Sequence, residues 1–503
     1  MVQEMEIKAL DRTAQCLRYS LLTGALIYMV VYLILALFRI QYPFELEWME
    51  GGSVDHVRRI LRGQKLYVSP SLQFIPYIYT PFYFYCSAAV SKILGIGFIP
   101  LRLISFISSL GSFFIIFLIV KQETRNIFSG VLASCLFAAT FKISGAWFDI
   151  ARADSLFLFL LLLAVYIMRF YTSRQSYIIA GVCISLAFLT KQAALFISLP
   201  LMVYAIYRSR RCSIFFIGII VVIVGISTIL LNYLHEGWYT YYVFELPREH
   251  TIVKHMLMQF WTKDLLSPLA VACMMSSLYL FTQLLHAPKE KFLFYFLLAV
   301  GMTGGAWISR LHAGGYLNTL LPAYAVLSIL FGLATHTVPE LIGVSYQEKR
   351  KLVEICLYLV CIAQFASLGY NPLHQIPTAK DLEAGKQLIT TIAQMKGDVF
   401  IPCHGYLTAL AGKNSYAHQM TMIDVLRGND ARTKIKLNNE IQQAIREKKF
   451  AAIILDSHRF GFDIEKYYKI KEPVFTNKEV FWPVTGSRRR PEFIYVPNND
   501  NAY

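Results

Sequence analysis

Three glutamates lie close together in a short acidic loop directly behind the first long apolar segment of the chain. They are Glu45, Glu47 and Glu50, in the stretch from Pro43 to Gly52. Carboxylates at a membrane surface are costly unless they are solvated or paired, so such a cluster either belongs to a hydrated loop or has a function. We expect at least one of these acids to be a catalytic base directed at a substrate held at the lipid surface.

Two further groups of polar residues lie at the ends of apolar segments. The turn from Asp149 to Asp154 contains two acids and Arg152 at the entry to a span. Asp154 either stabilises the N-terminus of that span or orients a substrate hydroxyl, and Arg152 would pair with an acid or a phosphate. Lys191 lies between two short spans, where it either extends its ammonium group to the interface or binds a lipid phosphate.

A late loop, residues 309–318, contains Arg310, His312 and Asn318 together with two flexible glycines. The guanidinium of Arg310 matches phosphate in its fork geometry, which makes it the best anion-binding candidate in this half of the chain. A lone histidine such as His312 is more often a hydrogen-bonded structural residue than a catalyst. The three histidines of the loop 235–264 have no compact ligand spacing, so we predict no metal site.

The segments that position these residues are apolar enough to cross a membrane. Of the 503 residues, 56% are hydrophobic and only 16% are charged, against about 25% charge in soluble domains. We therefore expect an α-helical polytopic membrane protein with about 11 spans of near-membrane length. The expected spans are residues 19–40, 101–120, 127–146, 154–171, 177–190, 193–208, 213–234, 265–286, 291–309, 315–335 and 352–370.

The distribution of charge sets the expected orientation. The formal net charge is +16, and Lys and Arg collect in short loops between spans. If the N-terminus is inside and the aromatic segment 75–97 lies in the interface without crossing, these basic loops all fall inside, as the positive-inside rule requires. The acidic loop, Lys191 and the C-terminus then fall outside. No basic-aromatic platform for single strands is visible, so we expect no nucleic-acid partner.

Two regions outside the spans have recognisable patterns. Within the first outer loop, residues 41–100, the segment 53–62 has helical spacing and carries Arg58 on a basic face, which predicts an interfacial amphipathic helix. Residues 371–503 alternate helix and strand, which predicts a small α/β domain behind a membrane domain of residues 1–370. Its expected elements are helices at 381–396, opened by Thr378, and at 436–448, with strands at 398–403, 450–455, 474–483 and 492–496.

The order of these motifs resembles that of the GT-C superfamily of polytopic glycosyltransferases, in particular the branch with protein O-mannosyltransferases and the lipid A aminoarabinose transferase. Those enzymes have an acidic motif in the first outer loop, often Asp-Glu, followed by an amphipathic juxtamembrane helix. Met49 replaces the first acid here, so the base would be Glu50 or Glu47. The likeness covers roughly residues 20–335 and rests on WMEG (48–51), GQKLY (63–67), YTPFY (79–83), RAD (152–154), LTKQ (189–192) and Gly314–Pro322 with Asn318.

The resemblance implies a membrane glycosyltransferase that moves a sugar from a polyprenyl-phosphate-linked donor to an acceptor on the outer face, with inversion. Glu50 would be the general base, with Glu47 as the alternative, Asp154 would help to position the acceptor, and no cofactor or metal would be needed. We expect a multi-pass protein of the plasma (inner) membrane in a bacterial cell envelope. The residues expected to contact substrate are Arg152, Lys191, Arg310, His312, Asn318 and Arg58.

Two other classes of protein are alternatives to an enzyme. A transporter or flippase of a lipid-linked or anionic solute would have charges inside its spans, paired across two repeated halves. The charges of this chain gather at one face and no repeat is visible, which favours the enzyme. A membrane scaffold would leave the clustered acids and cations without a cause.

Overall fold

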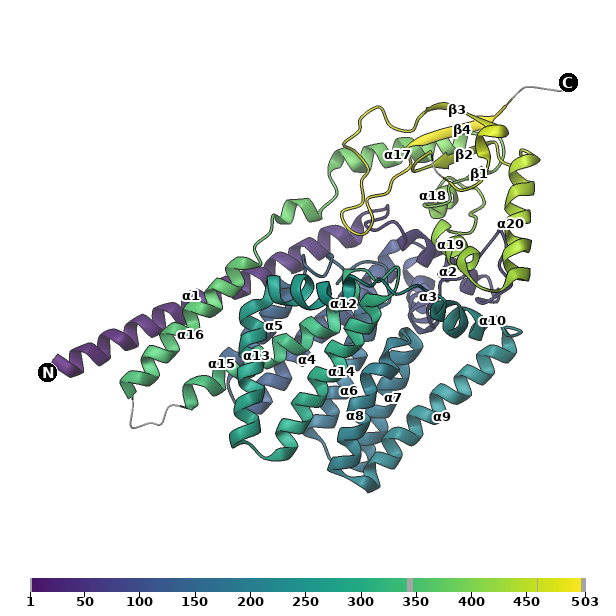
Figure 1. The fold of residues 1–503 in the computed structure, drawn as a ribbon. Coiled ribbons are helices and arrows are strands. Elements are labelled where there is room, and N and C mark those ends of the chain that lie inside the picture. Colours follow the sequence, from purple (N-terminus) through teal and green to yellow (C-terminus); the bar gives the residue numbers. More distant parts are fainter. Residues whose placement is uncertain (1, 342–346, 459, 499–503) are drawn as a thin grey trace.

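The computed structural model describes residues 2–341, 347–458 and 460–498. They form a bundle of helices with a smaller mixed domain at one end, and α1 and α16 extend together from the bundle (Figure 1). The main helices of the bundle are α1 (Val2–Gln41), α4 (Phe98–Thr124), α5 (Ile127–Ala139), α6 (Asp154–Phe170), α7 (Arg174–Thr190), α8 (Ala193–Arg208), α9 (Arg210–Leu234), α13 (Ser267–His286), α14 (Lys289–Leu311), α15 (Leu321–Glu340) and α16 (Gln347–Ser367).

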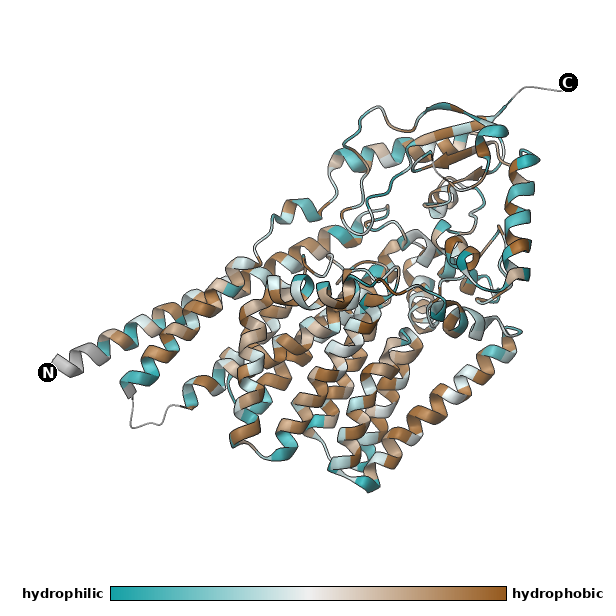
Figure 2. Ribbon diagram, viewed as in Figure 1, coloured by the Kyte–Doolittle hydropathy of each residue, from teal (hydrophilic) through white to brown (hydrophobic). Residues whose placement is uncertain are grey.

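Apolar residues dominate the bundle, and polar ones are frequent in the C-terminal part (Figure 2). Among the described residues, six helical segments are long and apolar enough to cross a membrane, and a bent pair near residues 348–394 would add a seventh. Four shorter apolar helices, including α5, α7 and α8, accompany them. The polytopic helical fold is confirmed, while the count of about 11 spans stays a prediction.

Short helices at one end of the bundle connect these spans. The segment expected to lie in the interface, residues 75–97, contains only α3 (Phe82–Leu94), whose 13 residues reach roughly 20 Å, less than the thickness of a bilayer core. The expected amphipathic helix is present as α2 (Glu50–Leu61). The loop 235–264 folds into α10 (Trp238–Thr240), a π-helical turn (Tyr241–Glu245), α11 (Leu246–Arg248), α12 (Met256–Gln259) and a second π-helical segment (Phe260–Leu266).

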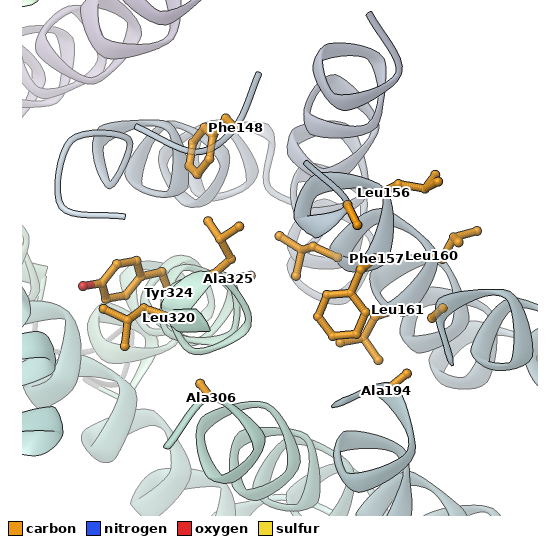
Figure 3. Packing of buried hydrophobic residues seen from close by; sticks show 14 of the residues in the cluster. Phe148, Leu156, Phe157, Leu160, Leu161, Ala194, Ala306, Leu320, Tyr324 and Ala325 are labelled. Carbon is orange, nitrogen blue, oxygen red and sulfur yellow. The ribbon is translucent and has the colours of Figure 1, made fainter. Parts of the chain in front are cut away.

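The bundle core is closely packed where α6, α8, α14 and α15 meet (Figure 3). Phe157, Leu161 and Ala194 are buried there. Two glycines of α14 let its backbone approach α8, because a Cβ on Gly305 would lie 2.3 Å from Cγ1 of Ile197. Small residues at helix contacts are the usual means of tight packing in membranes, where lipid supplies no hydrophobic drive for association.

The C-terminal part has a four-stranded sheet in the order β1-β2-β4-β3. Strands β1 and β2 are parallel, whereas β4 is antiparallel to both β2 and β3. Its elements are α17 (Ala379–Gln394), β1 (Val399–Phe400), α18 (Gly405–Leu410), α19 (Gln419–Arg427), α20 (Ala431–Arg446), β2 (Ala452–Leu455), β3 (Tyr468–Pro473) and β4 (Phe493–Pro497), with 3₁₀ turns at Pro372–Gln375 and Ile464–Lys466. The small α/β unit is confirmed, and its boundary at residue 370 stays a prediction.

One expected strand is wrong. Residues 474–483 form no strand, and the edge strand β3 lies before them, at Tyr468–Pro473. The apolar residues of the expected strand serve a different purpose, because Phe481 packs against Phe44 of the acidic loop and its backbone N–H bonds Asp381 at 2.6 Å. Asn477 caps a turn there by accepting from the N–H of Glu479, as asparagine commonly does in turns.

Candidate active site

The acidic loop lies between the bundle and the C-terminal part, and five segments converge on it. Three of them contact the loop itself: the N-terminal part of α4, the turn before α6, and residues 484–489. The other two, the end of α7 and the 3₁₀ turn Leu317–Leu320 before α15, contact Asp154 beside it. The Glu47 and Glu50 side chains are 1% and 0% exposed, and that of Glu45 is 7% exposed. A buried carboxylate must be paired or neutral, so the partners of each acid indicate what it does.

Glu50 is completely engaged by its neighbours. Arg102 holds it in a two-point ion pair, with Nε 3.0 Å from Oε1 and Nη2 2.6 Å from Oε2. The backbone N–H groups of Ala151 and Leu46 each donate at 2.6 Å. Burial raises the pKa of Glu50, but Arg102 and these hydrogen bonds more than offset it, so the pKa lies below its ordinary value. Such a carboxylate is a poor proton acceptor and a strong structural anchor.

Glu47 is held less tightly. Its Oε2 atom accepts from Nη1 of Arg152 and from the Met49 N–H, both at 3.2 Å. Burial raises its pKa to about 7, although Arg152 opposes the shift. Gly486 covers the same side chain: a Cβ there would lie 2.6 Å from Cγ of Glu47, and its φ of +77° favours glycine. A buried carboxylate that titrates near neutral pH has the property required of a general base.

Asp154 joins three segments at the start of α6. Its Oδ1 atom accepts from Nζ of Lys191 at 2.5 Å and from the Asn318 amide at 2.8 Å, and Oδ2 accepts from Nε1 of Trp147 at 2.9 Å. Three residues that the sequence singled out separately, Asp154, Lys191 and Asn318, therefore form one polar cluster. The acid also lies in the first turn of α6, where a negative charge is favoured by the helix dipole.

Arg152 connects the acidic loop with the polar cluster around Asp154. It contacts Glu47 and donates from Nη2 to the Tyr79 hydroxyl at 2.9 Å. Its guanidinium lies 5.6 Å from the centre of the Trp147 ring, whose indole N–H in turn bonds Asp154. Burial lowers the pKa of Arg152, but the neighbouring Tyr79, Glu47 and Asp154 raise it by more than burial lowers it. The side chain therefore stays charged.

The other expected substrate residues, Arg310, His312 and Arg58, contact neither the glutamates of the acidic loop nor the cluster around Asp154. Arg310 pairs with Asp264 at 2.9 Å and donates to the carbonyl of Gly315. His312 forms an isolated backbone bridge with Ile252, and its buried Nδ1 has no hydrogen-bond partner among the described atoms. Arg58 pairs with Asp55 at 2.8 Å and bonds Ser415, which places it at the contact with the C-terminal part.

Glu45 links the acidic loop to the C-terminal part. Its Oε2 atom contacts Nδ1 of His404, and the opposite ring nitrogen lies 3.4 Å from Oδ2 of Asp456. Burial lowers the pKa of His404, but the two carboxylates raise it to about 10. Burial also raises the pKa of Glu45 to about 7, against the influence of His404. The charged imidazole thus joins an acid from each part of the molecule.

Sequence reasoning missed several partners that decide these roles. Arg102 is an arginine inside an otherwise apolar span, and that signal was available, since such a charge requires a partner. The same holds for Arg39, which pairs with Asp149 at 2.8 Å with both side chains fully buried. His404 and Gly486 carried no local signal, because only the tertiary fold brings them to the acidic loop. Two histidines of the loop 235–264 contact different partners. His235 bonds the backbone of Tyr67, and His250 pairs with Asp424.

A family model described as dolichyl-phosphate-mannose-protein mannosyltransferase matches residues 79–231. A search of curated protein sequences returns no match.

Two crystal structures cover nearly the whole chain. ArnT from Cupriavidus metallidurans bound to undecaprenyl phosphate matches with a TM-score of 0.59 at 12% identity, over 94% of this chain and 98% of that one. The apo state of ArnT matches with a TM-score of 0.59 at 13% identity, over 93% and 97%. The chain therefore has the GT-C fold, as the motif order indicated.

Proposed function

We propose that this chain is a membrane glycosyltransferase that uses a polyprenyl-phosphate-linked sugar as donor and a hydroxyl group as acceptor. The observation that carries the proposal is the Glu47 carboxylate, which is buried, paired with Arg152 and shifted in pKa to about 7. The family model supports this donor class, because its description names dolichyl phosphate mannose. The likeness in fold to ArnT, which was crystallised with undecaprenyl phosphate, supports it as well.

The reaction is a single displacement. Glu47 accepts the proton of the acceptor hydroxyl, the acceptor oxygen attacks the anomeric carbon, and the bond from that carbon to the phosphate oxygen breaks, with inversion. The polyprenyl phosphate is a good leaving group, so no general acid is needed, and cations near the phosphate stabilise its developing charge. Glu50, which the sequence made the first candidate for the base, holds the loop in place through Arg102.

The cations for this role are Lys191 and Arg310. Lys191 pairs with Asp154, and Arg310 pairs with Asp264. A phosphate bound beside these pairs would accept hydrogen bonds from the same two basic side chains. The basic residues Lys121, Arg169 and Arg208 lie at the opposite helix ends from the acidic loop. By the positive-inside rule that end faces the cytoplasm, so the site and the C-terminal part would face outward.

The proposal is tested with purified protein in lipid nanodiscs and a panel of polyprenyl-phosphate sugars. We expect release of free polyprenyl phosphate from at least one donor, and a product whose anomeric configuration, read by NMR, is inverted. A panel in which no donor binds and none is consumed would contradict the proposal. Accumulation of a lipid-linked solute across sealed vesicles without bond cleavage would favour the transporter.

Lys191 provides a second test. We expect Lys191→Gln to raise the KM for the donor about 10- to 100-fold, because one charge-assisted contact to phosphate is worth about 1.5–3 kcal/mol. Lys92→Gln, at an exposed position near the end of α3, is the matched control and should leave the KM unchanged. Equal donor KM values in the two variants would remove Lys191 from the phosphate site.

A further inference from the structure

The two arginine–glutamate pairs of the acidic loop differ in geometry. Arg102 and Glu50 are joined by two hydrogen bonds, at 3.0 and 2.6 Å. Among the described atoms, Arg152 and Glu47 are joined by one, from Nη1 to Oε2 at 3.2 Å, although these side chains are only 5% and 1% exposed. The fork of a guanidinium fits a carboxylate in two contacts, and a buried ion pair depends on such geometry. The single contact of Arg152 therefore requires a cause.

That cause is the second nitrogen of the guanidinium, which Tyr79 engages. Nη2 of Arg152 donates to the Tyr79 hydroxyl at 2.9 Å, a shorter bond than the one from Nη1 to Glu47. The backbone of Tyr79 is itself held, because its carbonyl accepts from the hydroxyl of the buried Tyr67 at 2.7 Å. A phenol oxygen accepts hydrogen bonds as well as donating one. The hydroxyl thus occupies the nitrogen that a two-point pair with Glu47 would use.

Three aromatic rings hold the guanidinium in this position. The ring centres of Tyr77, Trp147 and Tyr79 lie 5.8, 5.6 and 5.5 Å from Cζ of Arg152, within the range of cation–π attraction. The Tyr77 hydroxyl donates to a backbone carbonyl of the acidic loop at 2.7 Å. The Trp147 indole N–H donates to the carboxylate at the start of α6 at 2.9 Å. These anchored rings oppose a movement of Arg152 towards the glutamate.

We propose that Tyr79 is a positioning residue for the reaction: its hydroxyl restricts Arg152 to a single contact with Glu47, so that the carboxylate can still take a proton from the acceptor. The inference rests on the proposed function and deepens its assignment of the base. A two-point pair would stabilise the charged form of Glu47, as Arg102 does for Glu50, and would leave a weaker base. Tyr79 thus helps to decide which of the two paired glutamates accepts the proton.

Other titratable groups also face Glu47 and Arg152. The acids are Glu45, Glu50 and Asp154. The tyrosines, whose pKa values are raised by burial, are Tyr77, Tyr83 and Tyr316. The histidines are His56 and His418, and burial lowers their pKa values to about 4 and about 3, so both are neutral near pH 7. The cation Arg489 lies over the ring of Trp48. Removal of the Tyr79 hydroxyl leaves all these groups in place, so a changed pH dependence reports on Arg152.

The test is the pH profile of Tyr79→Phe, measured on the full chain in nanodiscs. Phenylalanine keeps the ring but gives Nη2 of Arg152 no acceptor, so the guanidinium closes on Glu47. We expect the rise of log kcat/KM to move about one pH unit lower and the plateau rate to fall several-fold, because the base is weaker. Tyr242→Phe is the matched control: its buried hydroxyl donates to the carbonyl of Val68 at 3.1 Å, and its profile should equal that of wild type. A rise that stays in place or moves upward in Tyr79→Phe would overturn the inference.

Protonation of Glu47 can also be followed without turnover. Infrared titration of the carboxyl C=O band, with the Glu47→Gln protein subtracted, gives the pH at which this side chain takes up its proton. We expect that pH to fall in Tyr79→Phe and to stay unchanged in Tyr242→Phe, with thermal midpoints verifying that both variants fold. A wild type that cleaves no donor would defeat the proposed function, and the titration would still decide the effect of Tyr79 on Glu47. An active wild type whose Glu47 titrates identically with and without the Tyr79 hydroxyl would overturn the positioning role alone.

Discussion

Glu47→Gln is expected to lower the rate of sugar transfer by about 10²–10⁴-fold, the usual contribution of a positioned general base. Donor binding should persist, because the phosphate ligands are untouched. The measurement is release of polyprenyl phosphate under single-turnover conditions, with donor affinity determined separately. Glutamine keeps the shape of the side chain and its contact with Arg152 but cannot accept the acceptor proton.

Glu50→Gln is the matched control for this change. It weakens the ion pair with Arg102 and should reduce thermal stability, while the surviving folded protein still transfers sugar. A folded Glu50→Gln protein without turnover, beside an active Glu47→Gln protein, would return the base to Glu50.

The pH dependence of the reaction tests the same assignment. Because burial raises the pKa of Glu47 to about 7, the base is protonated and inactive below that pH. We expect log kcat/KM to rise with unit slope up to about pH 7 and then level off. Glu45 also has a pKa of about 7, so Glu45→Gln should be measured in parallel. The rise should survive in that variant and disappear in Glu47→Gln.

Arg102→Met is expected to be the most destabilising single change in this region. Glu50 would stay buried without its counter-ion, a loss that typically costs about 3–5 kcal/mol. Arg102 also donates to the carbonyls of Arg39 at 3.0 Å and Phe44 at 2.6 Å, and these would be left unsatisfied. Thermal unfolding in detergent, followed by tryptophan fluorescence, measures the shift.

Two further variants isolate the cause. Lys121→Met removes a cation from the exposed far end of the same helix and should change the midpoint little. The double variant Arg102→Met/Glu50→Gln should unfold at a higher temperature than Arg102→Met alone, because the unpaired charge is gone. Identical midpoints for Arg102→Met and Lys121→Met would show that the ion pair does not anchor the loop.

Local patterns predicted the elements better than they predicted the site. Thr378 does cap α17, in a reciprocal capping box with Asp381, because the signal lies within four residues. The segment 474–483 was expected to be a strand, but it is a loop in which Phe481 packs against Phe44. Pattern alone could not foresee that, since tertiary contacts decide the conformation of short apolar segments.

The site residues show the same limit. Residue type and order predicted that Glu47, Glu50, Asp154 and Lys191 belong to one site, and the structure brings them close to one another. Which glutamate is the base depends on its surroundings, and those come from distant segments: Arg102 for Glu50 and Gly486 for Glu47. A carboxylate's pKa is set by burial and by neighbouring charges, and neither is visible in the acidic loop itself.

The contact between Gly486 and Glu47 has a consequence for biosynthesis. A ribosome makes the acidic loop long before it makes Gly486, so a nascent chain inserts its helices while the Glu47 carboxylate is still uncovered. That carboxylate becomes buried only when the C-terminal part folds onto the bundle, which makes its burial a late step of folding.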